Sequence, residues 1–509
     1  MVPLPHEFRE ISSSLKDSEE FLKKEFSNST DIVFREFYMG DIKCLAVWVD
    51  GLTNSRISHD LFRSLMLDAD PGRLKDIVGT ERMDYVSQHL IPHYATIRVV
   101  DMIELKRWIL MSKMALLIDS IPAGLIVDAE NPPVRSISES INEAVVMGPR
   151  DSFVESLRIN TALIRGRLGD SRLKSENYII GRRSNTLVTL MFIDDIADPE
   201  IVQEARTRLT RIDIDGIMDS AYIKEMIQDR PFSLFPLMKS TERPDKVVAD
   251  LLEGRFAIIV EGSPQILTAP TVFNEFIQSA EDYYQNPIFV WAVRCLRILS
   301  MFFALVVPGA YVAITTFHQE MIPIPLVFTI AGSRETVPFP AFIEALALLF
   351  FFELLWEAGL RLPRVVGGAV SIVGALILGQ GAVSAGLVSQ TMTIVIAITA
   401  IANFALGSAY ELASAIRLLR LMVLVAGSVL GFYGIGLIFL GFMIHLAGLR
   451  SFGVSYMEPW MPLRTGQMND AVFRAPRWAM TLRPSYIAGE DLTRNNTRRP
   501  SPPPDTQKN

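Results

Sequence analysis

The 509-residue chain is poor in the residues that build disulfide frameworks and metal sites. It has two cysteines, Cys44 in a predicted strand and Cys295 at a predicted membrane boundary, and its six histidines are scattered without ligand spacing. Disulfide frameworks and zinc sites need several such residues at defined spacing, so we expect neither a disulfide nor a metal site, and no cofactor. The first 26 residues also lack the apolar core of a secretory signal peptide, so export of the N-terminal part is not predicted.

Catalytic and nucleic-acid-binding signatures are missing as well. The net charge is −7, and no basic stripe interleaved with aromatic residues occurs, so nucleic acid is not an expected partner. Ser, His and Asp form no nucleophile motif. Asp213, Asp215 and Gly216 resemble the start of a calcium loop, but the later ligands are missing and a turn is the better interpretation. The sequence therefore predicts a protein that is not an enzyme.

Apolar sequence is abundant, and it is concentrated in one half of the chain. Residues 1–285 are typical of a soluble α/β protein, whereas residues 288–449 hold almost all of the long apolar runs. The predicted fold class is an α/β soluble N-terminal half of two subdomains followed by an all-α polytopic membrane domain. The predicted domains are residues 1–133 and 134–286 (α/β subdomains), 287–449 (membrane) and 450–509 (a basic, partly disordered tail).

The α/β half contains an internal repeat. The phrase ALLIDSIP at residues 115–122 resembles AIIVEGSP at residues 257–264, at an offset of 142, and an apolar strand ending at Asp50 resembles one ending at Asp194, at an offset of 144. Duplication predicts two units with the same strand order. The alternative is that two unrelated sheets each needed an apolar strand followed by an acidic turn.

The apolar half predicts about five membrane spans, at residues 298–316, 340–358, 365–387, 391–413 and 421–447. Arginines flank one set of span ends, which places the N-terminal domain in the cytoplasm by the positive-inside rule. Five spans then put the basic tail on the opposite side, in conflict with that rule. Either the glycine-rich run 421–447 bends back as a hairpin, or the segment 317–338 also spans. The FRAPRWAMTLRP part of the tail, in turn, either lies on a membrane surface or packs on the soluble domain.

Polar side chains within the apolar runs are the candidate functional residues: Glu344, Glu353, Gln380, Asn403 and Glu411. A carboxylate in hydrocarbon costs a few kcal/mol unless it faces water or a partner. Glu344 and Glu353 are nine residues apart, which puts them on opposite faces of a helix and about 13.5 Å apart in height. We predict that at least one of them lines a water-filled path where several copies meet, with packing against another polar residue as the alternative. Glu411 lies six residues before Arg417, and an interfacial ion pair explains it more simply.

A family resemblance is carried by the segments FHQEMIPIPL, AGSRETVPFPAFIEAL and EAGLRLPRVVGGAVSIVGALILGQGAVSAGLVS. They closely resemble the A subunits of bacterial spore germinant receptors, the GerA family of spore germination proteins. The resemblance continues in EAVVMGPRDSFVESLRINTALIRGRL and in RSFGVSYMEPWMPLR, and it covers nearly the whole chain, with the first ~130 residues the least diagnostic.

This resemblance implies a multi-pass protein of the spore inner membrane, with its N-terminal domain on the core side. It implies a homo-oligomer that acts with a transporter-like B subunit and a lipoprotein C subunit, and that forms a ligand-gated ion path. Three alternatives stay open: a paralogue encoded with the dipicolinate-channel genes, a transporter, and a membrane scaffold without a pore. A scaffold differs from the others in carrying no conductance.

Overall fold

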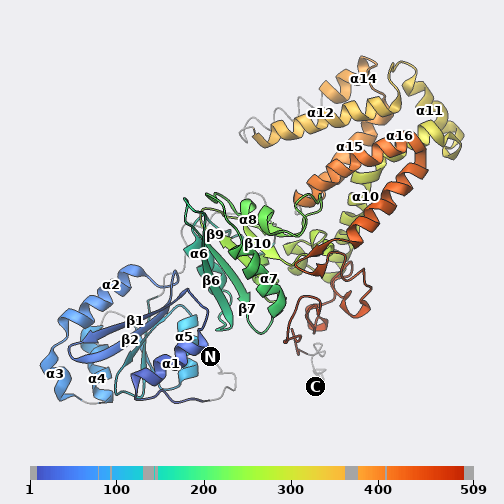
Figure 1. Cartoon of the computed structure of the whole chain (residues 1–509). Helices are drawn as coiled ribbons and strands as arrows, with labels where there is room; N and C mark the ends of the chain where they lie inside the picture. Colours follow the sequence, from blue (N-terminus) through green and yellow to red (C-terminus); the bar gives the residue numbers. More distant parts are fainter. Residues whose placement is uncertain are drawn as a thin grey trace, which may run out of the picture.

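The computed structural model describes residues 8–77, 79–91, 95–129, 143, 147–361, 377–406 and 410–497. It comprises two α/β units, a group of long helices, and a tail that returns to the second unit (Figure 1). The end of the tail that was predicted to be disordered, residues 498–509, lies outside the described residues, as does most of the predicted span 365–387.

The first unit is a five-stranded antiparallel sheet between two helical layers. Its strands are β1 (Ile32–Met39), β2 (Ile42–Val49), β3 (Thr96–Val99), β4 (Met114–Ile118) and β5 (Gly124–Val127), in the spatial order β1-β2-β4-β5-β3. Its helices are α1 (Leu15–Glu25), α2 (Ser55–Arg63), α3 (Pro71–Asp76), α4 (Thr80–Tyr85) and α5 (Met102–Leu110). Side chains alternate along a strand, so Cys44 and Ala46 of β2 pack towards α2, α3 and α4, whereas Leu45 and Val47 pack towards α1 and α5.

The second unit repeats this architecture. Its strands are β6 (Leu173–Ile180), β7 (Thr186–Ile193), β8 (Lys239–Thr241), β9 (Phe256–Val260) and β10 (Ile266–Ala269), in the order β6-β7-β9-β10-β8. Its helices are α6 (Leu157–Arg165), α7 (Pro199–Thr210), α8 (Ser220–Ile227) and α9 (Pro244–Leu251). One face of the sheet packs on α7 and α8, and the other on α6 and α9.

The two sheets agree in register as well as in order. Cys44 lies opposite Ile118 between β2 and β4, and Val188 lies opposite Val260 between β7 and β9. The offsets between equivalent residues are again 144 and 142. The prediction that the two units share a strand order is therefore confirmed, and a chance resemblance of two short phrases would not produce a matching register.

A buried ion pair joins the two units. The guanidinium group of Arg165 in α6 donates to both carboxylate oxygens of Asp31, each at 2.8 Å, and both side chains are almost entirely buried. Beside this pair, the backbone N–H of Thr30 donates to the carbonyl of Ser175 in β6. Because burial of either charge alone would be costly, the pair defines how the units face each other.

The C-terminal half is helical. Its helices are α10 (Pro287–Phe317), α11 (Ile324–Arg334), α12 (Ala341–Arg361), the short α14 (Ala382–Ser384), α15 (Gln390–Phe404) and α16 (Tyr410–Ala447). Within the described ranges, two of these, α10 and α16, are long and apolar enough to cross a membrane.

Helix α16 folds back on itself at Gly431. This glycine has φ 60° and ψ −144°, outside the helical region, and it lies against the ring of His318 just beyond the end of α10. Leu412 in the first arm and Leu446 in the second share one apolar cluster with Tyr456 of the tail, so both ends of α16 lie at the same end of the bundle. The predicted boundaries of the spans 391–413 and 421–447 are wrong, because α15 ends at Phe404 and α16 begins at Tyr410. The alternative in which the glycine-rich run bends back as a hairpin agrees with the structure (Figure 1).

The tail packs on the second α/β unit. Phe452 and Ile487 belong to the apolar core between the sheet and α7, and Ala488 bridges to Ala197. Arg494 forms an ion pair with Glu253, just beyond α9. These parts of the tail therefore pack on the second α/β unit, whereas Phe473 and Trp478, within the FRAPRWAMTLRP part, are exposed.

Candidate functional site at the junction of the two halves

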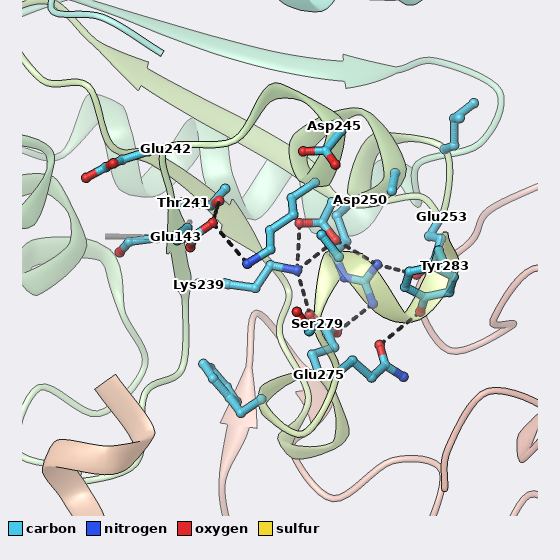
Figure 2. Close-up of a pocket in the computed structure, with 18 of the residues that line it drawn as sticks. Glu143, Lys239, Thr241, Glu242, Asp245, Asp250, Glu253, Glu275, Ser279 and Tyr283 are labelled. Atoms are coloured by element: carbon cyan, nitrogen blue, oxygen red, sulfur yellow. Dashed lines mark hydrogen bonds and ion pairs between the residues drawn. The ribbon is translucent and has the colours of Figure 1, made fainter. Parts of the chain in front are cut away.

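A cavity of about 670 Å³ lies where the second α/β unit, the helices and the tail meet. The α/β unit supplies β8 and α9, α12 supplies Trp356, α16 supplies Glu411, and the tail supplies three arginines. The arginines are Arg477, Arg483 and Arg494. Figure 2 shows the charged side chains that line one wall, with several carboxylates converging on a few basic groups.

An ion-pair network forms this wall. The Lys239 ammonium group in β8 lies 2.8 Å from Asp250 of α9 and 3.3 Å from Glu275. Arg255 lies 2.5 Å from Glu275 and 2.5 Å from Glu253, and Thr268 donates a hydrogen bond to Asp250. Each charge is thus paired, which is the condition under which charged groups persist in an interior.

The pKa values of this network show which charges it stabilises. Burial alone would lower the pKa of Lys239, but Asp250 and Glu275 outweigh it and raise the pKa above its ordinary value. Burial alone would raise the pKa of Glu253, but Arg255 and Arg494 hold it at about 2. Both groups stay charged at neutral pH, so the wall acts as an ionic clamp between sheet and tail rather than as an acid–base pair.

Two further ion-pair clusters connect the α/β half to the helices. Glu411, in the first turn of α16, accepts from the ammonium group of Lys224 in α8 at 2.5 Å and from the hydroxyl of Ser240 at 2.9 Å. Arg294, in the second turn of α10, is fully buried between Asp282 at 2.9 Å and Asp470 of the tail at 3.0 Å. The expectation of an ion pair at Glu411 is met, although its partner is Lys224 and not Arg417.

Glu344 is an internal residue. Its side chain is 1% exposed, and one carboxylate oxygen accepts from the backbone N–H of Ser389 at 2.6 Å and from its hydroxyl at 2.5 Å. Ser389 caps the N-terminus of α15, where the helix dipole favours a negative charge. Of the explanations offered for this acid, a buried polar partner is the one that the geometry supports.

Glu353 occupies a different environment. Its carboxylate lies 2.7 Å from Arg417 of α16, and its side chain is 47% exposed. The Arg417 guanidinium group also lies over the ring of Trp356, 5.4 Å from the centroid. Two helices far apart in sequence thus bring an arginine to Glu353.

The other candidates are dispersed. Gln380 is exposed beside α14, and Asn403 is buried in α15 with an amide oxygen that has no hydrogen-bond partner among the described residues. Arg420, one of the arginines that flank the predicted span ends, is buried in α16, and two of its nitrogens likewise have no partner within the described ranges.

The cavity wall was not predicted from the sequence. Lys239, Asp250, Arg255 and Glu275 lie in no recognisable motif, and only the three-residue strand β8 brings Lys239 to the others. The described part of the chain contains no group of three metal-binding side chains that could hold an ion.

Comparison with known proteins identifies close relatives. A family model described as "Bacillus/Clostridium GerA spore germination protein" matches residues 20–486. The spore germination protein KA of Bacillus subtilis is 41% identical over 97% of this chain and 90% of its own length. The spore germination protein GerLA of Bacillus cereus is 34% identical over 95% of this chain and 98% of its own length. The crystal structure of the N-terminal domain of the A subunit of the Bacillus megaterium spore germinant receptor GerK3 is 30% identical, with a TM-score of 0.42, and covers 53% of this chain and 99% of its own.

Proposed function

The chain belongs to the GerA family of spore germination proteins, and we propose that it serves in germination as the A subunit of a nutrient germinant receptor. In this proposal it is a multi-pass protein of the spore inner membrane. It assembles with further copies of itself, with a transporter-like B subunit and with a lipoprotein C subunit. The proposal draws support from relatives that are named as spore germination proteins and from the two long apolar helices.

The α/β half and the tail lie on one side of the membrane, the core side. The hairpin in α16 supports this arrangement, since it returns the chain to the end of the bundle where α10 begins. An even number of crossings follows, and the basic tail then obeys the positive-inside rule together with the arginines at the base of α10. The first arm, residues 410–430, is about 31 Å long, enough for the hydrocarbon core of a bilayer.

The observation that carries the proposal is the ionic connection between the α/β half and two membrane helices. Lys224 holds the first turn of α16, and Asp282 holds the base of α10, so a displacement of the second α/β unit moves both helices. A signal received outside the membrane can bias the bundle only if such contacts differ between its states. These ion pairs are the contacts that would differ.

The ion path is formed where several copies meet, and Glu353 is the acid that faces it. Its exposed side supports this role, whereas Glu344 is enclosed by its own chain. A ring of carboxylates around a symmetry axis favours cations and opposes anions. In each subunit, the positive charge of Arg417 offsets the negative charge of Glu353 and holds its carboxylate in place.

Spores that lack the gene provide the test. Complementation with the wild-type gene should restore both the response to a nutrient mixture and the early release of cations from the core. A protein that is only a scaffold would restore assembly of its partners, yet when reconstituted with them it would add no cation conductance to a planar bilayer. Normal nutrient germination without the gene would overturn the receptor assignment.

A further inference from the structure

An exposed apolar patch lies beside the base of α10. It consists of Ile288, Phe289 and Trp291 of that helix and Phe473 and Trp478 of the tail, all of which are exposed. Trp291 and Phe473 are stacked, with ring centroids 5.4 Å apart and planes 13° apart. The helix and the tail therefore meet at this stack, and the five exposed residues are called the base patch.

The base patch is held rigidly. Directly behind it, Arg294 donates to Asp282 and to the side chain and backbone carbonyl of Asp470, and to the carbonyl of Ala471. Tyr283 donates its hydroxyl to Asp470 at 2.7 Å. These bonds fix the tail to α10 within three residues of Phe473, so exposure of the patch is not a consequence of a loose chain end.

The surroundings of the base patch carry excess positive charge. Four guanidinium groups lie near the carboxylates of Asp282 and Asp470: those of Arg294, Arg297, Arg474 and Arg477. Of the four, only that of Arg477 is exposed. Hydrogen-bond donors also outnumber acceptors there. One side-chain nitrogen of Arg294 and one of Arg474 are buried with no acceptor among the described residues. Arg477 is exposed and lies over the Tyr283 ring, 5.1 Å from its centroid.

The patch lies at the outer edge of the headgroup layer in its height along α10. Trp291 lies seven residues before Ile298, where the predicted span begins, which is about 10 Å along the helix. The headgroup region on each side of a bilayer is about 5–8 Å thick, so Trp291 lies just beyond its outer boundary if the span begins at Ile298. The exposed apolar face continues without interruption from Ile288 through Leu299 to Phe302, so the patch is the lower end of the surface that faces lipid.

We propose that the base patch docks on the anionic headgroup layer of the membrane that α10 enters. Aromatic rings that are apolar on one side and polar on the other are enriched at this level, and arginines add attraction to anionic lipids. The inference rests on α10 spanning the membrane, and it does not depend on ion conduction. The tail thus acts as a membrane-surface anchor that fixes the height of the second α/β unit.

Depth-dependent quenching in lipid nanodiscs tests this proposal on the full chain. Cys295→Ser removes one native thiol, and burial raises the pKa of the Cys44 thiol to about 12, so Cys44 stays protonated and inert. A fluorophore is attached at one of three positions in separate variants: Phe473→Cys, Phe302→Cys in the middle of α10, or Met218→Cys, an exposed position just before α8. The discs contain phosphatidylcholine with or without phosphatidylglycerol, and nitroxides at the headgroup or deep in the acyl chain.

The expected result is quenching of the Phe473 probe by headgroup nitroxide, quenching of the Phe302 probe by acyl-chain nitroxide, and none at Met218. Arg477→Gln should lower the docked-to-undocked ratio of the Phe473 probe about fivefold in anionic discs, and Arg477→Lys should preserve it. Quenching at Phe302 without quenching at Phe473 would overturn the anchor and leave the span intact. Absence of quenching at both Phe302 and Phe473 would overturn both the span and the anchor. Cross-linking of Phe473→Cys to a second copy would assign the patch to a subunit contact instead.

Discussion

Lys224 of α8 and Glu411 of α16 form an ion pair whose charged atoms are 2.5 Å apart, across the junction between the α/β half and the helices. Both side chains are largely buried, and the hydroxyl of Ser240 in β8 contacts the same carboxylate oxygen. The contact joins α8, which packs on one face of the second sheet, to the first turn of α16. In the proposed function, this pair transmits a movement of α8 to α16.

Reversal of this pair should weaken the nutrient response. Lys224→Glu places two carboxylates together, whereas Lys224→Glu with Glu411→Lys restores opposite charges, so the double variant should recover part of the loss. The coupling energy is on the order of 1 kcal/mol. Germination rate against nutrient concentration measures it, and Lys43→Glu, which reverses the exposed pair with Glu36, is the control. Equal responses of the single and double variants would show that the contact is not used.

The buried pair between the two α/β units should contribute far more to stability than its exposed neighbour. Asp31→Asn leaves the Arg165 charge buried without its counterion, which costs about 3–5 kcal/mol. Asp50→Asn breaks the exposed pair with Arg158 and should cost about 0–1 kcal/mol. Denaturant unfolding of the α/β half, followed by circular dichroism, compares the two variants. Equal costs would mean that the units are held together by other contacts.

Acid should remove the contribution of Glu253. Its pKa of about 2 in the folded protein is below its ordinary value of 4.5, so its contribution is complete above about pH 4.5 and is lost as the pH falls towards 2. Glu253→Gln should therefore destabilise the protein by on the order of 2 kcal/mol at pH 7, and the difference from wild type should shrink between pH 4.5 and 2. Denaturation midpoints across this range measure the effect. A difference that is constant with pH would contradict the ionic clamp.

Much of the α/β half could be predicted because the patterns that specify its strands and turns lie within a few neighbouring residues. The turn Met39-Gly40-Asp41 between two apolar runs predicts the hairpin β1–β2, and the structure has it there. The repeat was readable for the same reason, since strand β4 and its acidic turn recur as β9 142 residues later. Equivalent bonds confirm it: the backbone N–H of Leu15 donates to Asp119, and that of Leu157 to Glu261.

The helical half and the cavity could not be predicted to the same degree, because their contacts are distant in sequence. Glu344 meets Ser389 across 45 residues and Glu353 meets Arg417 across 64, and a helical pattern does not say which helices are neighbours. Strand β8 has three residues, too few to show a period. The glycine-rich run that forms α16 allowed a hairpin, but the sequence does not say which glycine turns it; the structure identifies Gly431 by its non-helical backbone and its contact with His318.

The turn at Gly431 should not tolerate a side chain. A Cβ there would lie 2.6 Å from the His318 ring, at a positive φ that residues other than glycine adopt at a cost of about 1–3 kcal/mol. Gly431→Ala should therefore reduce accumulation of the protein, whereas Gly436→Ala, where nothing lies within 4 Å, should be neutral or stabilising. Impermeant labelling of Thr465→Cys in oriented vesicles reports the side of the tail. A tail on the side opposite to the α/β half would refute the hairpin topology.

Cation flux through the reconstituted receptor, in variants of Glu344 and Glu353 of α12, tests the proposed ion path most directly. Glu353→Gln removes an exposed charge and should reduce the preference for cations over anions, whereas Glu344→Gln keeps an oxygen that can accept from Ser389 and should leave flux unchanged. Accumulation and assembly of each variant serve as the control. Reduced cation selectivity in Glu353→Gln alone is the predicted result, and wild-type selectivity in a Glu353→Gln protein that assembles normally would contradict the account.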